Sequence, residues 1–196
     1  MTGKVERSGN ELSDNFRELA ERYAALSRAH TREQLLWRPG PGAWCIAECA
    51  EHVALGNTAY LEKMLPAIAR TSGKAEDDQP LRMHGWLARL VFKSVLPEAP
   101  RKLKAPKKIR PILVDPERAF SRLAKTYAEI QIILRAEPQA DLNKIRFQNP
   151  FLPLVRFTVA SGILILAAHC RRHLMQAEQI AMLPEFQQMP SVTAST

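Results

Sequence analysis

Residues 163–180 read ILILAAHCRRHLMQAEQI, and this stretch decides the fold that the sequence predicts. Its apolar residues recur at intervals of three and four positions, a pattern typical of a helix that faces a buried core. We therefore expect the last long helix to run over residues 158–182. The same stretch contains two histidines, His169 and His173, which lie about 40° apart around a helix axis and share one face.

The remainder of the chain also shows helical periodicity, interrupted by connections rich in proline. A turn of helix is expected over 31–36, where Thr31 and Gln34 have the spacing of a capping box. Asn10 or Ser13 is expected to cap the first helix, and Asp115-Pro116-Glu117 is a strong helix start. No alternating strand pattern of any length is found. The other long helices are expected at 12–28, 45–70 and 115–136, and a shorter one at 81–96.

These elements predict an all-α fold, a four-helix bundle in which a long crossover joins the second and third long helices and contains a short extra helix. The 196 residues suffice for one domain with a sizeable core, so we expect a single domain over 1–196. The crossover is assigned to 71–114. The polar tails, residues 1–9 and 187–196, are expected to be disordered.

Composition excludes several classes of protein. The net charge is +8, and residues 101–110, RKLKAPKKIR, hold six basic residues and no acid. This segment contains Pro106 and no aromatic residue for base stacking, so a solvated loop is expected rather than a nucleic-acid interface.

The N-terminus lacks a signal-peptide core, and the longest apolar run is too short to cross a bilayer, which favours a cytoplasmic protein without membrane contact. Three cysteines, an odd number, without a secretory signal argue against a disulfide framework.

A third imidazole is available to complete a site with His169 and His173. His30 and His84 fall at a helix end and in the insertion, where surface positions are expected, but His52 falls in the middle of the predicted helix 45–70. One hypothesis is a three-histidine metal site inside the bundle. The small residues expected to leave room around it are Gly56, Ala59 and Gly162.

Two other interpretations fit the same pattern. The histidines could be core residues that form hydrogen bonds with buried polar groups such as Glu48 and Gln176. Cys45, Cys49 and His52 also share a helix face and could ligate zinc, although Cys49 lies about 60° from His52 around the helix. Periodicity alone does not decide among these three.

Two segments together carry a family resemblance. Residues 37–53, WRPGPGAWCIAECAEHV, and residues 163–180 resemble the DinB superfamily, whose pattern is a tryptophan-proline turn, a W-S-x-x-E-x-x-x-H helix start and a late H-x-x-x-H-L-x-Q. The resemblance runs in order from about residue 35 to 180. The residues that carry it are Trp37, Pro39, Trp44, Glu48, His52, His169, His173, Leu174 and Gln176.

The resemblance implies a four-helix bundle in which His52, His169 and His173 bind a divalent metal ion, nickel or zinc being the expected ions. It further implies a metal-dependent S-transferase or hydrolase that uses a small-molecule substrate and a low-molecular-weight thiol such as bacillithiol, mycothiol or glutathione. The alternative is a non-catalytic metal-binding protein of the stress response or an interaction protein, as a homodimer whose partner surface includes the 81–96 helix. No catalytic residue is assigned, and Glu48 is expected to cap a helix rather than act as a base.

The chain departs from the family pattern at two cysteines. Cys45 stands where serine or threonine is usual, which is expected to weaken the capping box with Glu48, because cysteine is a poor cap. Cys170 follows the first late histidine, where the family often has a polar residue. A helix places Cys170 about 100° from His169, so direct ligation is not expected, and its role is not explained by the sequence.

Overall fold

The structure is a computed structural model that describes residues 5–71, 79–99, 104–136 and 140–190. Four long helices dominate it: α1 (Gly9–Ala29), α3 (Ile46–Ala69), α5 (Pro116–Arg135) and α6 (Val159–Ala181). The shorter elements are α2 (Arg32–Leu36), α4 (Trp86–Val95), the 3-10 turn η1 (Lys107–Ile109), α7 (Pro184–Gln187), and the strands β1 (Glu6–Arg7), β2 (Leu81–Arg82), β3 (Arg146–Gln148) and β4 (Arg156–Thr158).

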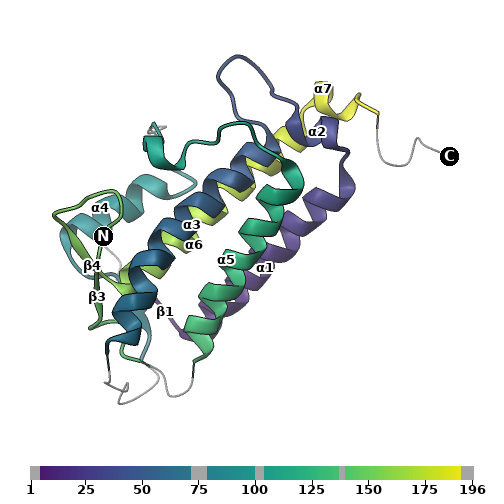
Figure 1. The fold of residues 1–196 in the computed structure, drawn as a ribbon. Coiled ribbons are helices and arrows are strands. Elements are labelled where there is room, and N and C mark those ends of the chain that lie inside the picture. Colours follow the sequence, from purple (N-terminus) through teal and green to yellow (C-terminus); the bar gives the residue numbers. More distant parts are fainter. Residues whose placement is uncertain (1–4, 72–78, 100–103, 137–139, 191–196) are drawn as a thin grey trace.

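The four long helices pack as a bundle in which α1 and α3 each lie beside both α5 and α6, so that α1 and α3 are diagonally opposite (Figure 1). The predicted four-helix bundle is therefore confirmed. Because α3 and α5 are neighbours that run in the same direction, the chain that leaves the end of α3 must cross back along the bundle before α5 begins. Residues 79–99 and 104–115 of this crossover are described, and they contain β2, α4 and η1.

Polar contacts between the helices show which of them run parallel and which antiparallel. Arg22 near the end of α1 forms an ion pair of 2.7 Å with Glu178 near the end of α6, so these neighbours are parallel. Asn57 of α3 donates to Thr126 of α5 at 3.0 Å, and the order of contacts along both helices makes them parallel as well. Arg135 at the end of α5 bonds Ser13 at the start of α1, so that pair is antiparallel.

The helix starts follow the local chemistry of the sequence. Thr31 and Gln34 form the expected capping box of α2, and the Asp115 side chain caps α5. The prediction for α1 is wrong: Ser8 is its cap, in a capping box with Glu11. Ser13 does not cap because it lies inside the helix, where it is buried against Arg135.

Short strands and a terminal helix are the elements that the sequence did not predict. β1 pairs with β2, so residues 6–9 of the predicted N-terminal tail have defined structure, and the helix expected at 81–96 begins only at Trp86. β3 and β4 form a three-residue antiparallel hairpin before α6. α7 extends the fold beyond α6, and its first and last residues are Pro184 and Gln187. Residues 1–4 and 191–196 of the two tails lie outside the described residues.

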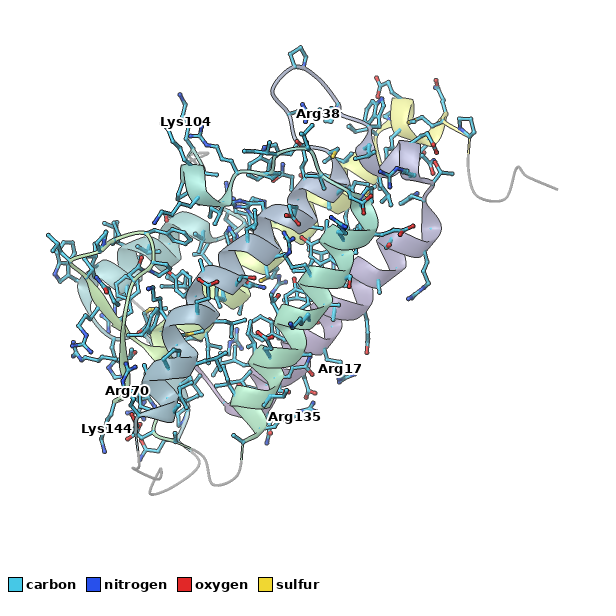
Figure 2. The ribbon with its side chains drawn as sticks, viewed as in Figure 1. Arg17, Arg38, Arg70, Lys104, Arg135 and Lys144 are labelled. Carbon is cyan, nitrogen blue, oxygen red and sulfur yellow. The ribbon has the colours of Figure 1, made fainter. Side chains whose placement is uncertain are left out.

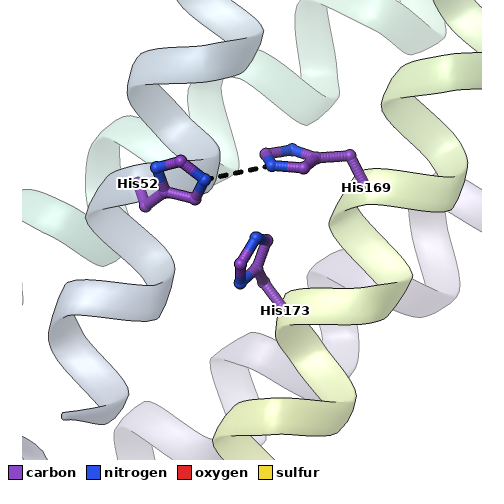
Figure 3. Close-up of side chains that lie close together, drawn as sticks. All are labelled: His52, His169 and His173. Atoms are coloured by element: carbon purple, nitrogen blue, oxygen red, sulfur yellow. Dashed lines mark hydrogen bonds between the residues drawn. The ribbon is translucent and has the colours of Figure 1, made fainter. Parts of the chain in front are cut away.

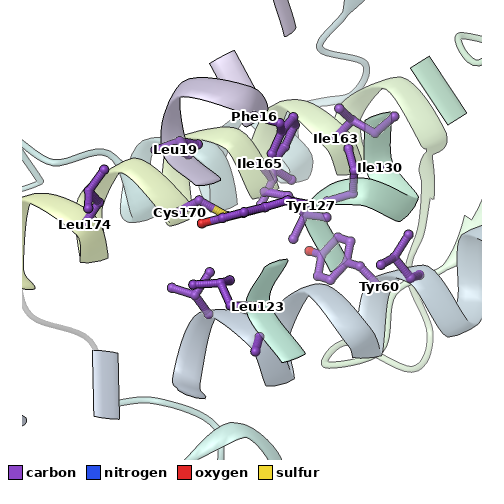
Figure 4. Packing of buried hydrophobic residues seen from close by; sticks show 14 of the residues in the cluster. Phe16, Leu19, Tyr60, Leu123, Tyr127, Ile130, Ile163, Ile165, Cys170 and Leu174 are labelled. Carbon is purple, nitrogen blue, oxygen red and sulfur yellow. The ribbon is translucent and has the colours of Figure 1, made fainter. Parts of the chain in front are cut away.

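The core is built from apolar and aromatic side chains on the inner faces of the long helices (Figure 4). The Tyr127 ring of α5 packs against Phe16 and Tyr23 of α1, with centroid distances of 5.8 and 6.4 Å. Charged side chains such as Arg17, Lys104 and Lys144 project away from the bundle (Figure 2). Within the described residues, no helix combines the length and apolar character needed to cross a membrane.

Gly162 of α6 is the place where a missing side chain allows close packing. A Cβ atom there would lie 2.9 Å from two ring atoms of Phe147 in β3 and 3.0 Å from the sulfur of Met64 in α3. The Phe147 ring is buried, so it has little freedom to move away. Gly162 thus lets the β3–β4 hairpin close over the junction of α3 and α6.

We expect G162A to destabilise the protein. Overpacking a core costs about 1–3 kcal/mol, whereas replacing a helical glycine by alanine gains only about 1 kcal/mol. G56A is the matched control, because a Cβ at Gly56 would meet its nearest neighbour, His169 Cε1, at an ordinary 3.5 Å. The midpoint of urea unfolding should fall for G162A and stay level or rise for G56A; a G162A protein as stable as the wild type would contradict this account.

Candidate metal centre

Three imidazoles meet between α3 and α6, near the N-terminal half of α3 (Figure 3). His52 comes from α3, and His169 and His173 come from successive turns of α6. One ring nitrogen from each residue lies within 4.8 Å of those from the other two. His52 and His173 are buried and His169 is partly buried. The structure thus brings together the three histidines that the sequence selected.

A main-chain carbonyl orients His52. The Nδ1 atom of His52 lies 2.8 Å from the carbonyl oxygen of Ile109 in η1. A carbonyl only accepts, so Nδ1 carries the proton and donates it, which leaves the lone pair of Nε2 directed toward the other histidines. A ligating histidine commonly donates its other ring N–H to a carbonyl or carboxylate in this way.

A side chain on the same helix orients His173. Its Nδ1 atom lies 3.1 Å from Oε1 of Gln176, one turn further along α6. With the amide oxygen in that position, Nδ1–H donates and Nε2 is again the free acceptor. Two of the three imidazoles are therefore held with Nδ1 engaged and Nε2 free to bind a metal ion.

The third contact tests whether these residues suit a metal ion. Nε2 of His52 lies 3.1 Å from Nε2 of His169. Because the His52 nitrogen carries a lone pair, a proton on His169 or a cation must lie between the two atoms to avoid repulsion. Zinc–imidazole bonds of about 2.0–2.1 Å place tetrahedral nitrogens about 3.4 Å apart, which is close to this separation. The donor set therefore fits a divalent ion.

Trp44 covers the imidazoles from the loop that precedes α3. The centroid of its ring system lies 4.6 Å from that of His52 and 5.7 Å from that of His173. The next residue, Cys45, caps the helix, and its Sγ accepts from the Glu48 N–H at 3.4 Å while Glu48 Oε2 accepts from the Cys45 N–H at 2.9 Å. The capping box is complete although cysteine stands where the family has serine. By holding Cys45 at the start of α3, the box also fixes the position of Trp44, the residue before it.

Glu48 is committed to this structural role. One carboxylate oxygen accepts from the Cys45 main chain, and the other accepts from Arg38 at 2.5 Å. Neither oxygen bonds a histidine, so the interpretation of Glu48 as a hydrogen-bond partner of the histidines is wrong. Its expected role as a helix cap is confirmed.

The cysteine alternative finds no support in the geometry. The described residues contain one group of potential ligands close enough to share an ion, and it includes no cysteine. Burial raises the pKa of Cys45 to about 11 and that of Cys49 further, so both are protonated thiols at neutral pH. Cys170 is also buried, and its Sγ–H donates to Asn57 Oδ1 at 3.5 Å. Cys170 therefore links α6 to α3 inside the core, and its hydrogen bond is to Asn57 rather than to one of the three histidines.

The small residues surround the site less closely than the sequence suggested. Gly56 is in contact with the site, since a Cβ there would touch His169. Gly162 is not, because it lies against Phe147 and Met64. His30 packs edge-on against Phe186 of α7 at 5.0 Å, and exposed His84 bonds Asn143, so neither joins the site.

The three imidazoles are neutral at physiological pH. Burial lowers the pKa of His52. Burial and the charges of His52 and Arg172 lower the pKa of His173, and the hydrogen bond to Gln176 raises it, so that its value is about 3. Burial also lowers the pKa of His169 well below its usual range, and His173, His52 and Arg172 each contribute to that shift. Neutral imidazole is the form that binds a metal ion.

Comparisons with known proteins bear on this site. Residues 15–177 match the family described as the DinB superfamily. The chain belongs to the DinB superfamily. A search of curated proteins gave no match. Among solved structures, YfiT from Bacillus subtilis superposes with a TM-score of 0.54 at 14% sequence identity, over 88% of this chain and 85% of that one. That structure is described as "a probable metal-dependent hydrolase with an unusual four-helix bundle topology", and the likeness supports the DinB fold assigned here.

The contributions of Ile109 and Trp44 to the site were not predicted. Ile109 acts through its main chain, and a carbonyl leaves no signature in the residue type. It lies in the basic segment 101–110, of which residues 104–110 are described; Lys104, Lys107 and Lys108 are exposed as expected of a solvated loop, but Ile109 is buried. Trp44 belonged to the family pattern, and only the structure places its ring on His52 and His173.

The low pKa of His173 predicts how stability depends on pH. The unfolded chain takes up this proton near pH 6.5 and the folded chain only near pH 3, so the unfolded state binds more protons between these values. The free energy of unfolding of the metal-free protein should therefore fall as the pH drops below about 6.5, by about 2 kcal/mol between pH 7 and pH 5 from His173 alone. Urea unfolding at several pH values measures this, and H173Q should flatten the dependence. Identical slopes for H173Q and the wild type would contradict it.

Proposed function

We propose that the protein holds one divalent metal ion between His52, His169 and His173 and uses it in a reaction on a small molecule. The observation that carries the proposal is the orientation of the imidazoles. Nδ1 of His52 is bound by the Ile109 carbonyl and Nδ1 of His173 by Gln176, so the Nε2 atom of each is free, and one ring nitrogen of each histidine lies within 4.8 Å of the other two. This orientation uses two hydrogen-bonding groups of the protein, and ligating histidines are commonly oriented in this way.

Nickel and zinc are the ions that we propose, because imidazole suits both and no carboxylate belongs to the cluster of described residues. Three protein ligands leave room for a further group, and a divalent ion held in this way acts as a Lewis acid and lowers the pKa of a thiol or water that it binds. The chain supplies orientation through Ile109 and Gln176 and shields the imidazoles from water through the Trp44 ring.

The reaction that we propose is transfer of a low-molecular-weight thiol, such as bacillithiol, mycothiol or glutathione, to an electrophile. The thiol sulfur forms a bond to an electrophilic carbon, the leaving group departs with its electron pair, and the thiol proton passes to solvent. Glu48 is occupied by Arg38 and Cys45, so it is not free to act as a general base. A thiol needs such a base less than water does, which favours thiol transfer over hydrolysis.

Element analysis of protein purified without a histidine tag tests the metal site. The wild type should contain about one divalent ion per chain, and H52A should lose it, because removing one of three ligands leaves too few to hold the ion. H84A is the matched control, since His84 is exposed and outside the cluster, and its metal content should be unchanged. Equal metal content in H52A and the wild type, or no metal in the wild type, would overturn the proposal.

A turnover assay with the metal-loaded protein tests the reaction. Each of the three thiols is mixed with 1-chloro-2,4-dinitrobenzene, and absorbance reports formation of the carbon–sulfur bond. A second assay uses p-nitrophenyl acetate to report hydrolysis. Thiol-dependent turnover that H52A abolishes and H84A keeps is the expected result. Hydrolysis of p-nitrophenyl acetate in the absence of any thiol would show that the protein is a hydrolase and overturn the proposed thiol transfer. Metal binding without either activity would favour a non-catalytic metal-binding protein.

A further inference from the structure

Arg172 of α6 lies between the two late histidines in the sequence, on the flank of the helix face that carries them. Its side chain is partly buried, and its Nη1 donates a hydrogen bond to the carbonyl oxygen of Leu96, the C-cap residue that follows α4. This contact holds the guanidinium where α4 packs against α6. A guanidinium has five N–H donors, so one bond to a carbonyl fixes its position and leaves other donors available.

Among the residues that the structure describes, no acidic side chain pairs with Arg172. The acids on α3 that flank His52 are already paired, Glu48 with Arg38 and Glu51 with Arg122. A partly buried cation without a counter-charge is costly, because water solvates it incompletely, and an anionic ligand would remove that cost.

The guanidinium is also close to the candidate metal site. Arg172 lies one residue before His173 and three after His169, which on a helix places it on the flank of the face that carries both. Its charge acts on both imidazoles and contributes to the lowering of the pKa of His169 and of His173. Arg172 is thus a cation on the flank of the site whose position is fixed by its hydrogen bond to Leu96.

We propose that Arg172 binds a carboxylate of the small molecule that occupies the three-histidine site, and so selects acidic substrates or acidic thiols. This inference rests on the proposed function, since it names the class of ligand for that site. A single guanidinium matches a single carboxylate, with two parallel N–H···O bonds. A neutral compound of the same shape leaves the guanidinium without a partner.

Two thiols of the same length test this proposal, one with a carboxylate and one with a hydroxyl in its place: 3-mercaptopropionate and 3-mercapto-1-propanol. The cobalt-loaded protein is titrated with each, and the visible spectrum reports thiol binding. The wild type should bind the carboxylate compound about tenfold more tightly or better, as a charge-assisted hydrogen bond implies. R172Q should lose this preference and keep its affinity for the neutral thiol.

R171Q is the matched control, because Arg171 is exposed and faces away from the site, and it should keep the preference of the wild type. R172K retains the charge without the planar fork and should fall between the wild type and R172Q. It also serves as the test if R172Q fails to fold. A preference retained in R172Q, or equal binding of both thiols by the wild type, would overturn the role of Arg172.

The metal content separates this inference from the proposed function. R172Q should contain as much metal as the wild type, since Arg172 is not a ligand. If the wild type takes up no metal, the proposed function fails, and calorimetric titration of the metal-free protein with the same two compounds then decides the role of Arg172 alone. A carboxylate preference that R172Q removes would support it, and equal or no binding of the two compounds would refute it.

Discussion

The antiparallel packing of α3 against α6 is the contact on which the candidate site depends. Two histidines on successive turns of α6 supply two of the three imidazoles, and the third comes from the helix that packs against them. The same packing removes the imidazoles from water, which is why their pKa values fall and why they are neutral. Burial would be costly for unpaired ring nitrogens, and the bonds to Ile109 and Gln176 offset that cost.

The topology of the bundle explains why the crossover takes part in the site. α3 and α5 are parallel neighbours, so the chain that leaves the end of α3 must return along the bundle before α5 can begin. On its way it forms α4, which packs on α6, and η1, whose Ile109 carbonyl reaches His52. A segment with the composition of a linker therefore supplies both the hydrogen bond that orients one histidine and the Leu96 carbonyl that positions Arg172.

The sequence predicted the elements whose causes are local. The start of α5 at Asp115 and the box of Thr31 with Gln34 were predicted because capping depends on residues three apart. The pairing of β1 with β2 joins residues some seventy-five positions apart, and two-residue strands have no detectable periodicity. A helical wheel gives angles but not heights: Gly162 shares a face with His169, yet seven residues place it about 10 Å away along the axis. It packs against Phe147 instead.

The charge balance around the histidines connects the fold to the choice of ligand. Neutral imidazoles do not cancel the charge of a divalent ion, whereas carboxylate ligands would. Glu48 and Glu51 are the acids nearest to His52 along α3, and Arg38 and Arg122 neutralise them. With a bound divalent ion and the proposed role of Arg172, both charges at the site would be positive, and the field there would favour an anion. If Arg172 has the proposed role, selection of the ligand depends on a side chain outside the three histidines, and a protein with the same bundle at 14% identity need not share a substrate.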